Sequence, residues 1–204
     1  IHMSSRESSD LIMSACGAFS PLQGFMCQTD YNSVVNNMHT AGNILWPIPI
    51  TLSVTTEQAD KLKENSEASL IDEESGELMG IITIREKYTY DKKTEAQSVF
   101  GTTDENHPGV AKVYAQGDVL IGGEVQALSE GKYPETYGEY YARPAETREI
   151  FSKKGWKTVA AFQTRNPLHR SHEYCTKIAM EVCDGLLLHP LVGKLKKGDI
   201  PAEI

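Results

Sequence analysis

Long apolar runs, clustered basic residues and a signal-peptide pattern are all missing from this sequence. No apolar stretch reaches the roughly 20 residues that a membrane-spanning helix needs, so we expect no membrane partner. The opening residues, Ile1 to Ser4, show no basic region followed by an apolar core, so none of them predicts a secretory signal. Lys and Arg total 20 against 28 Asp and Glu, a formal net charge of −8. That acidic balance argues against a nucleic-acid partner.

Cysteine is also scarce, and none of its spacings is CxxC. The four residues are Cys16, Cys27, Cys175 and Cys183. This usage indicates reduced thiols and a cytoplasmic protein. Cys175 and Cys183 fall on a predicted helix, where we expect both to pack in a core.

What is present is an ordinary globular composition, with 40% hydrophobic and 24% charged residues in 204. That length suits one large domain or two small ones. Up to residue 141 the pattern is one of short strands and turns, with only short helical stretches. Residues 68–72 and 77–88 predict a hairpin whose second strand is central. The whole segment predicts a small β-barrel or folded sheet.

Weaker patterns complete this first part. Gly122-Gly123 predicts a bulge in a strand over 118–127. The remaining expectations are an edge strand over 46–54, helices over 10–16, 31–39 and 57–62, and segments 94–100 and 110–116 on either side of a loop.

The character changes near residue 142, where we place a domain boundary between 1–141 and 142–204. A helix over 143–154 leads into a buried strand over 157–163, a helix over 167–183 and a second buried strand over 186–192. Strand, helix and strand form a βαβ unit, which should be parallel and right-handed. On the long helix, the expected buried stripe is Leu168, Cys175, Ala179 and Val182.

The turn between that first strand and its helix carries the polar groups, in the run from Gln163 to His172. Ligands of open α/β sheets bind beyond the carboxyl ends of the strands. We expect Pro167 at the first helical position and Asn166 at the N-cap, so that free N–H groups and the helix dipole attract an anion. His169 and His172 are three residues apart and can face one phosphate chain.

Arg165 and Gln163 add donors suited to a tetrahedral oxyanion. No nucleophile with an adjacent base is visible, which fits a reaction in which one bound anion attacks another. Simpler interpretations stay open. Asn166 alone could be a helix cap, Arg165 an ion-pair partner, and the two histidines ordinary surface residues or metal ligands.

This run resembles the signature of the ATP sulfurylase (sulfate adenylyltransferase) family. Three other segments match motifs of that family, and the match covers nearly the whole chain: Phe19-Ser20-Pro21-Leu22-x-Gly24-Phe25, Thr102-Thr103-Asp104-x-x-His107-Pro108-Gly109-Val110, and His189-Pro190-Leu191-Val192-Gly193 with Asp199-Ile200-Pro201. The resemblance implies a β-rich PUA-like domain followed by the start of a Rossmann-like α/β nucleotidyltransferase domain.

It further implies an enzyme of sulfate assimilation or sulfur oxidation. ATP, with Mg²⁺, would react with sulfate to give adenylyl sulfate and pyrophosphate, or the reverse, in a homo-oligomer. Gln163 and Arg165 would contact sulfate; Thr164, Arg165 and Asn166 would form the active-site turn; and His169 and His172 would stabilise the transition state at the ATP phosphates.

The sequence departs from the family pattern in two places. Ser171 stands where a small residue such as Gly or Ala is usual, and the family's Gly-Arg-Asp-His-Ala-Gly motif is absent. We therefore expect these 204 residues alone to be inactive. Two motifs, Phe19 to Phe25 and Thr102 to Val110, are expected to be structural. A further set, Lys194, Lys196 and Lys197, is expected to be solvated.

Three alternatives remain. The chain could belong to another adenylyltransferase of the same superfamily, one that acts on an organic phosphate. It could be a non-catalytic PUA-like binding module. It could also belong to a fused enzyme with a downstream kinase domain.

Overall fold

A computed structural model describes residues 1–191 and residue 200. The chain divides into two compact units, which we call unit 1 (Ile1–Lys132) and unit 2 (Tyr133–Ile204). The domain boundary that the sequence predicts near residue 142 stays a prediction. None of the helices in the described part of the chain has the length and apolarity of a transmembrane span.

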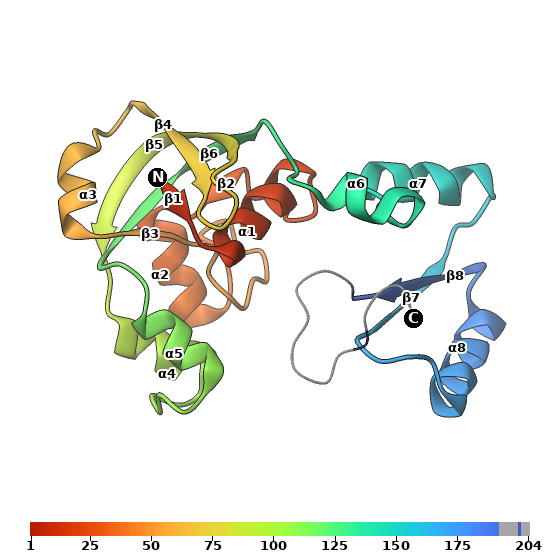
Figure 1. Cartoon of the computed structure of the whole chain (residues 1–204). Coiled ribbons are helices and arrows are strands. Elements are labelled where there is room, and N and C mark those ends of the chain that lie inside the picture. The colour runs from red at the N-terminus through yellow and green to blue at the C-terminus, as the bar shows by residue number, and fades with distance from the viewer. Residues whose placement is uncertain (192–199, 201–204) are drawn as a thin grey trace. The chain divides into compact units, whose positions relative to one another are not determined.

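Unit 1 is built around one mostly antiparallel sheet (Figure 1). Its strands are β1 (His2–Met3), β2 (Gly24–Phe25), β3 (Leu52–Val54), β4 (Glu67–Asp72), β5 (Leu78–Thr89) and β6 (Val119–Ala127). They are ordered β1-β4-β5-β6-β2, with β3 also paired to β6. The predicted hairpin is therefore confirmed as β4 and β5, and β5 is central as expected.

The expected bulge lies on the opposite strand. The extra residue is in β5, where the register shifts between Ile84 and Glu86, facing Gly122 and Gly123 of β6. A Cβ on Gly123 would lie 2.0 Å from the Thr83 carbonyl oxygen, closer than any side chain allows. The glycine pair thus permits the close approach at the bulge rather than forming it.

The helices of unit 1 start earlier than their apolar pattern suggests, and a side-chain cap sets the start of each of them except α2. Helix α1 (Ser5–Ala15) begins five residues before the predicted start, at a capping box of Ser4 and Glu7. The expected edge strand over 46–54 shortens to β3. The other helices are α2 (Gln28–Asn37), α3 (Thr56–Lys61), α4 (Lys92–Phe100) and α5 (Pro108–Tyr114).

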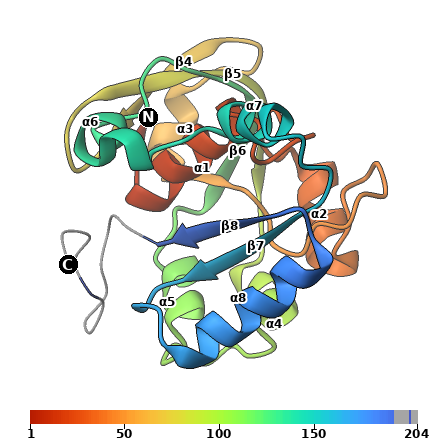
Figure 2. The ribbon, with the colours of Figure 1, turned by 90° about the vertical axis from the view of Figure 1, so that its right-hand side faces the viewer.

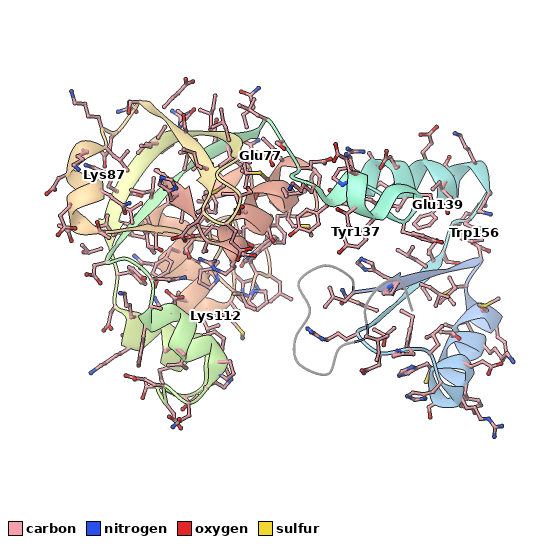
Figure 3. The ribbon with its side chains drawn as sticks, in the orientation of Figure 1. Glu77, Lys87, Lys112, Tyr137, Glu139 and Trp156 are labelled. Atoms are coloured by element: carbon pink, nitrogen blue, oxygen red, sulfur yellow. The ribbon has the colours of Figure 1, made fainter. Side chains whose placement is uncertain are left out.

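Long-range side chains tie these helices to the sheet. The ammonium of Lys87 on β5, labelled in Figure 3, donates to the carbonyls of Ala59 and Leu62 at the end of α3, both at 2.8 Å. The positive charge of Lys87 is also stabilised there by the negative end of the helix dipole. Apolar side chains from the sheet and from α1 and α2, including Leu11, Val34, Ile82 and Leu120, fill the core.

The two motifs expected to be structural have packing roles in unit 1. In the first, Phe25 is buried and Phe19 packs edge-on against Trp46, with 5.8 Å between the ring centroids. In the second, His107 is the N-cap of α5, and its Nδ1 accepts from the Gly109 N–H at 3.2 Å. The imidazole also packs on Phe100.

Unit 2 contains a two-stranded parallel sheet flanked by a helix (Figure 2). Its elements are α6 (Tyr133–Tyr137), η1 (Gly138–Tyr140), α7 (Pro144–Lys153), β7 (Val159–Thr164), α8 (Arg170–Val182) and β8 (Gly185–Pro190). The predicted helix before the βαβ unit and the parallel strand pair are both confirmed. Both strands are only partly covered among the described residues, so the expectation of fully buried strands was wrong.

The buried stripe predicted for α8 was also largely wrong. Leu168 lies before the helix and is exposed, as are Cys175 and Val182, and only Ala179 is half-buried. Thr176 is the helix residue that is buried, and its hydroxyl donates to the Glu173 carbonyl at 2.9 Å. The helix also begins three residues later than predicted, and the face that it covers is that of His172, Thr176 and Ala179.

Candidate active site at the strand-to-helix turn

The candidate site lies at one end of the parallel strands β7 and β8. Hydrogen bonds of Asp184 join the segments at the opposite end. There the Asp184 carboxylate accepts from the Lys157 N–H and the Thr158 N–H, both at 2.8 Å. These backbone bonds, that of Thr158 first, hold the pKa of Asp184 below its usual range. A Cβ on Gly185 would lie 2.2 Å from the Trp156 ring, so the indole packs directly on the β8 backbone (Figure 3).

The turn after β7 is shaped by the hydroxyl of Thr164. That hydroxyl accepts from the Asn166 N–H and donates to the Asn166 carbonyl, each at 3.0 Å. The expected N-cap at Asn166 and first helical position at Pro167 were therefore wrong, since both lie in the loop before α8. The physical reason is that the Thr164 hydroxyl bonds to both the N–H and the carbonyl of Asn166, so the backbone forms a turn there instead of a helix start.

His169 is the actual N-cap of α8. Its Nδ1 accepts from the Ser171 N–H at 3.3 Å. A ring nitrogen that accepts carries no proton, so the neutral imidazole with its proton on Nε2 is the form that makes this cap. His169 therefore offers an Nε2–H donor at the positive end of the helix.

His172 lies against His169, with 3.7 Å between the ring centroids and 28° between the planes. Its ring also packs on Phe162 of β7, centroid to centroid at 5.2 Å. The His172 Nδ1 is buried and has no hydrogen-bond partner among the described residues. The predicted neighbourhood of the two imidazoles is thus present, as a stacked pair fixed by a cap and an aromatic contact.

The structure separates the remaining predicted residues into two groups. Thr164 and Asn166 are joined by hydrogen bonds where β7 ends. Gln163 is exposed, and alternation along β7 turns it away from the face on which Phe162 meets His172. Arg165 is half-buried and begins the loop. One turn therefore presents donors to two sides of the strand end.

The two histidines were also considered as metal ligands. Among residues 1–191 and 200, no group of three His, Cys, Asp or Glu side chains is placed to hold a metal ion. The lysines expected to be solvated, Lys194, Lys196 and Lys197, lie outside the described residues. The sequence interpretation gave no role to His189, which lies one residue before the end of β8 and pairs with Gln163. Only the strand register reveals that neighbour.

Comparison with known proteins agrees with this two-part architecture. Residues 1–130 match the family model described as a PUA-like domain, which places the first unit in that class of fold. Residues 138–204 match the model described as ATP-sulfurylase. The chain belongs to the family of the PUA-like domain, whose model covers most of it, and its later part matches ATP-sulfurylase, which confirms the resemblance seen in its motifs.

Curated relatives match along the whole chain. A sulfate adenylyltransferase of Desulforamulus reducens is 57% identical over 204 residues, which are 100% of this chain and 52% of that protein. Another, of Pelodictyon phaeoclathratiforme, is 56% identical over 100% of this chain and 51% of its own length. The chain therefore spans about half the length of these relatives.

Among solved structures, a hexameric APS kinase from Thiobacillus denitrificans superposes with a TM-score of 0.71 at 26% identity. The match covers 98% of this chain and 35% of that one. With the two family matches, this likeness confirms the expected fold class, a PUA-like β-rich part followed by the start of a Rossmann-like α/β domain.

Proposed function

We propose that this chain forms one wall of the active site of a sulfate adenylyltransferase, which transfers AMP from ATP to sulfate. The observation that carries the proposal is the turn from Gln163 to His172, in a chain 57% identical over its full length to a protein of that name. The same site would run the reaction backwards, from adenylyl sulfate and pyrophosphate to ATP.

In this reaction a sulfate oxygen attacks the α-phosphorus of ATP. The new S–O–P bond forms while the bond from the α-phosphorus to the bridging oxygen breaks, and pyrophosphate leaves. Sulfate carries no proton at neutral pH, so the attack requires no general base. This agrees with a turn that contributes donors and lacks an activated nucleophile.

Each side of the turn then has a task. Gln163 and Arg165 would hold sulfate, while Thr164, Arg165 and Asn166 would shape the turn around the reacting phosphate. His169 and His172 would donate to the phosphate oxygens, where negative charge grows in the transition state. A stacked pair needs little rearrangement to do so, because the cap and the Phe162 contact already fix the rings.

Mg²⁺ would enter as MgATP, bound to the phosphates of the nucleotide. We also expect a homo-oligomer, in line with the hexameric description of the structural neighbour. A cytoplasmic location stays a prediction based on the cysteine usage.

The test uses a hybrid enzyme, in which these 204 residues are joined to the part of the Desulforamulus reducens relative that they do not cover. We expect the hybrid to release pyrophosphate from MgATP only when sulfate or molybdate is present, and the 204 residues alone to release none. Release driven by an organic phosphate and not by sulfate would contradict the proposal and favour the related adenylyltransferase.

A further inference from the structure

Strands β7 and β8 run side by side (Figure 2), and their last residues are in register. Gln163 pairs with His189, and Thr164 pairs with Pro190. Backbones of neighbouring strands are about 4.8 Å apart, and paired residues of parallel strands project from the same face. The imidazole of His189 is therefore the lateral neighbour of the Gln163 amide.

The face that carries this pair is the one opposite α8. Phe162 packs on His172 of that helix, so Phe162 and its partner Leu188 belong to the helix side. Side chains alternate along a strand, so Gln163 and His189 project from the other side. Both residues are exposed.

Two features hold the backbone at His189 in place. A residue before proline is restricted to extended geometry, and Pro190 imposes this on His189. Beyond the proline, the Leu191 N–H donates to the Thr164 carbonyl at 2.8 Å, so the strands stay joined past the pair. Within residues 1–191, neither the Gln163 amide nor the His189 imidazole makes a hydrogen bond inside the protein.

We propose that His189 is a sulfate-binding residue, a role that rests on the function proposed above. Its ring N–H donates to one of the sulfate oxygens that does not attack phosphorus, beside the donors of Gln163 and Arg165. The end of β7 thus divides the site: sulfate lies on the Gln163–His189 side, and the ATP phosphates lie on the side of His169 and His172. His189 acts as a hydrogen-bond donor, because sulfate has no proton to lose.

The test compares three variants of the hybrid enzyme by steady-state kinetics. His189→Ala should raise the KM for sulfate about 10-fold, the loss expected for a hydrogen bond to a charged group, with the KM for MgATP within about 2-fold of wild type. His189→Gln keeps an amide donor at a similar reach and should restore most of the sulfate affinity. Leu188→Ala, one residue earlier and on the opposite face, is the matched control and should leave the KM for sulfate unchanged.

The outcomes separate the two proposals. A hybrid with no sulfate-dependent pyrophosphate release overturns the proposed function, and the role of His189 with it. An active hybrid in which His189→Ala leaves the KM for sulfate unaltered, or changes it no more than Leu188→Ala does, overturns only the role of His189. Equal increases in both KM values would also contradict it, since they would indicate a general disturbance of the strand end.

Discussion

The two units of this chain differ in what holds their side chains in place. The buried apolar side chains of the described residues run from Met3 to Ile121, all in unit 1. In the described part of unit 2, the buried residues are Thr176 and Gly185, and neither brings a large apolar side chain. Unit 1 is thus held by an apolar core, whereas the candidate site in unit 2 is positioned by caps, backbone bonds and ring contacts.

The largest loss of unfolding free energy is expected from a change in the apolar core of unit 1. Leu120→Ala removes a fully buried side chain and should cost about 3 to 4 kcal/mol of unfolding free energy, for lost transfer energy and the remaining cavity. Urea unfolding in a Trp156→Phe background, with Trp46 as the fluorescent probe, measures it. Leu128→Ala, at a position 54% exposed, is the control and should change stability by less than about 1 kcal/mol. Similar losses in both variants would refute the comparison.

In unit 2 the largest effect should appear in catalysis rather than in stability. His169→Ala in the hybrid enzyme should lower kcat about 100-fold, as expected when one transition-state donor is removed, with a smaller change in nucleotide affinity. His169→Ser separates the two roles of this residue, because serine restores the helix cap and cannot reach the phosphates. Recovery of kcat in the serine variant would show that capping alone matters.

The anchor of β8 gives an intermediate effect. Gly185→Ala places a Cβ 2.2 Å from the Trp156 ring and should destabilise unit 2 by about 2 kcal/mol, as overpacking does elsewhere. The Trp156 fluorescence in a Trp46→Phe background reports the change. Met180→Ala on α8, at a position 59% exposed in the same unit, is the control and should change stability by less than about 1 kcal/mol. Normal stability of Gly185→Ala would mean that the indole moves aside without cost.

The smallest effect is a pH dependence of unit 1. Burial raises the pKa of Asp10 to about 6 from its ordinary 3.8, against the opposing charge of Arg6 at 3.0 Å. The folded state then binds a proton that the unfolded state lacks, so stability should rise by about 1 kcal/mol as the pH falls from 7 to 5. Asp10→Asn should flatten this rise in urea titrations, and Asp60→Asn on the exposed side of α3 should not. A rise that survives in Asp10→Asn would assign it to another group.

Local patterns predicted the elements whose signal lies within a few residues. Alternating apolar residues around a turn predicted the hairpin β4–β5. The helical spacing of residues 143–154, followed by Gly155, predicted α7. Predictions failed where distant or competing contacts decide. Asn166 does not cap the helix, because its N–H donates to the Thr164 hydroxyl. Gly122 and Gly123 do not form the bulge but allow the bulged strand β5 to approach closely.

For the site, the sequence alone determined which chemical groups stand at the turn, because residue types and their order along the chain are local facts. It could not determine which nitrogen of His169 serves as a cap, that the two imidazoles stack, or that His189 lies beside Gln163. Those facts depend on strand register and on where a helix begins. Strand register is settled by pairing between residues far apart in sequence, which only the tertiary structure brings together. The start of α8 is settled by competition among nearby side chains for the same backbone groups, and the folded chain decides which of them wins.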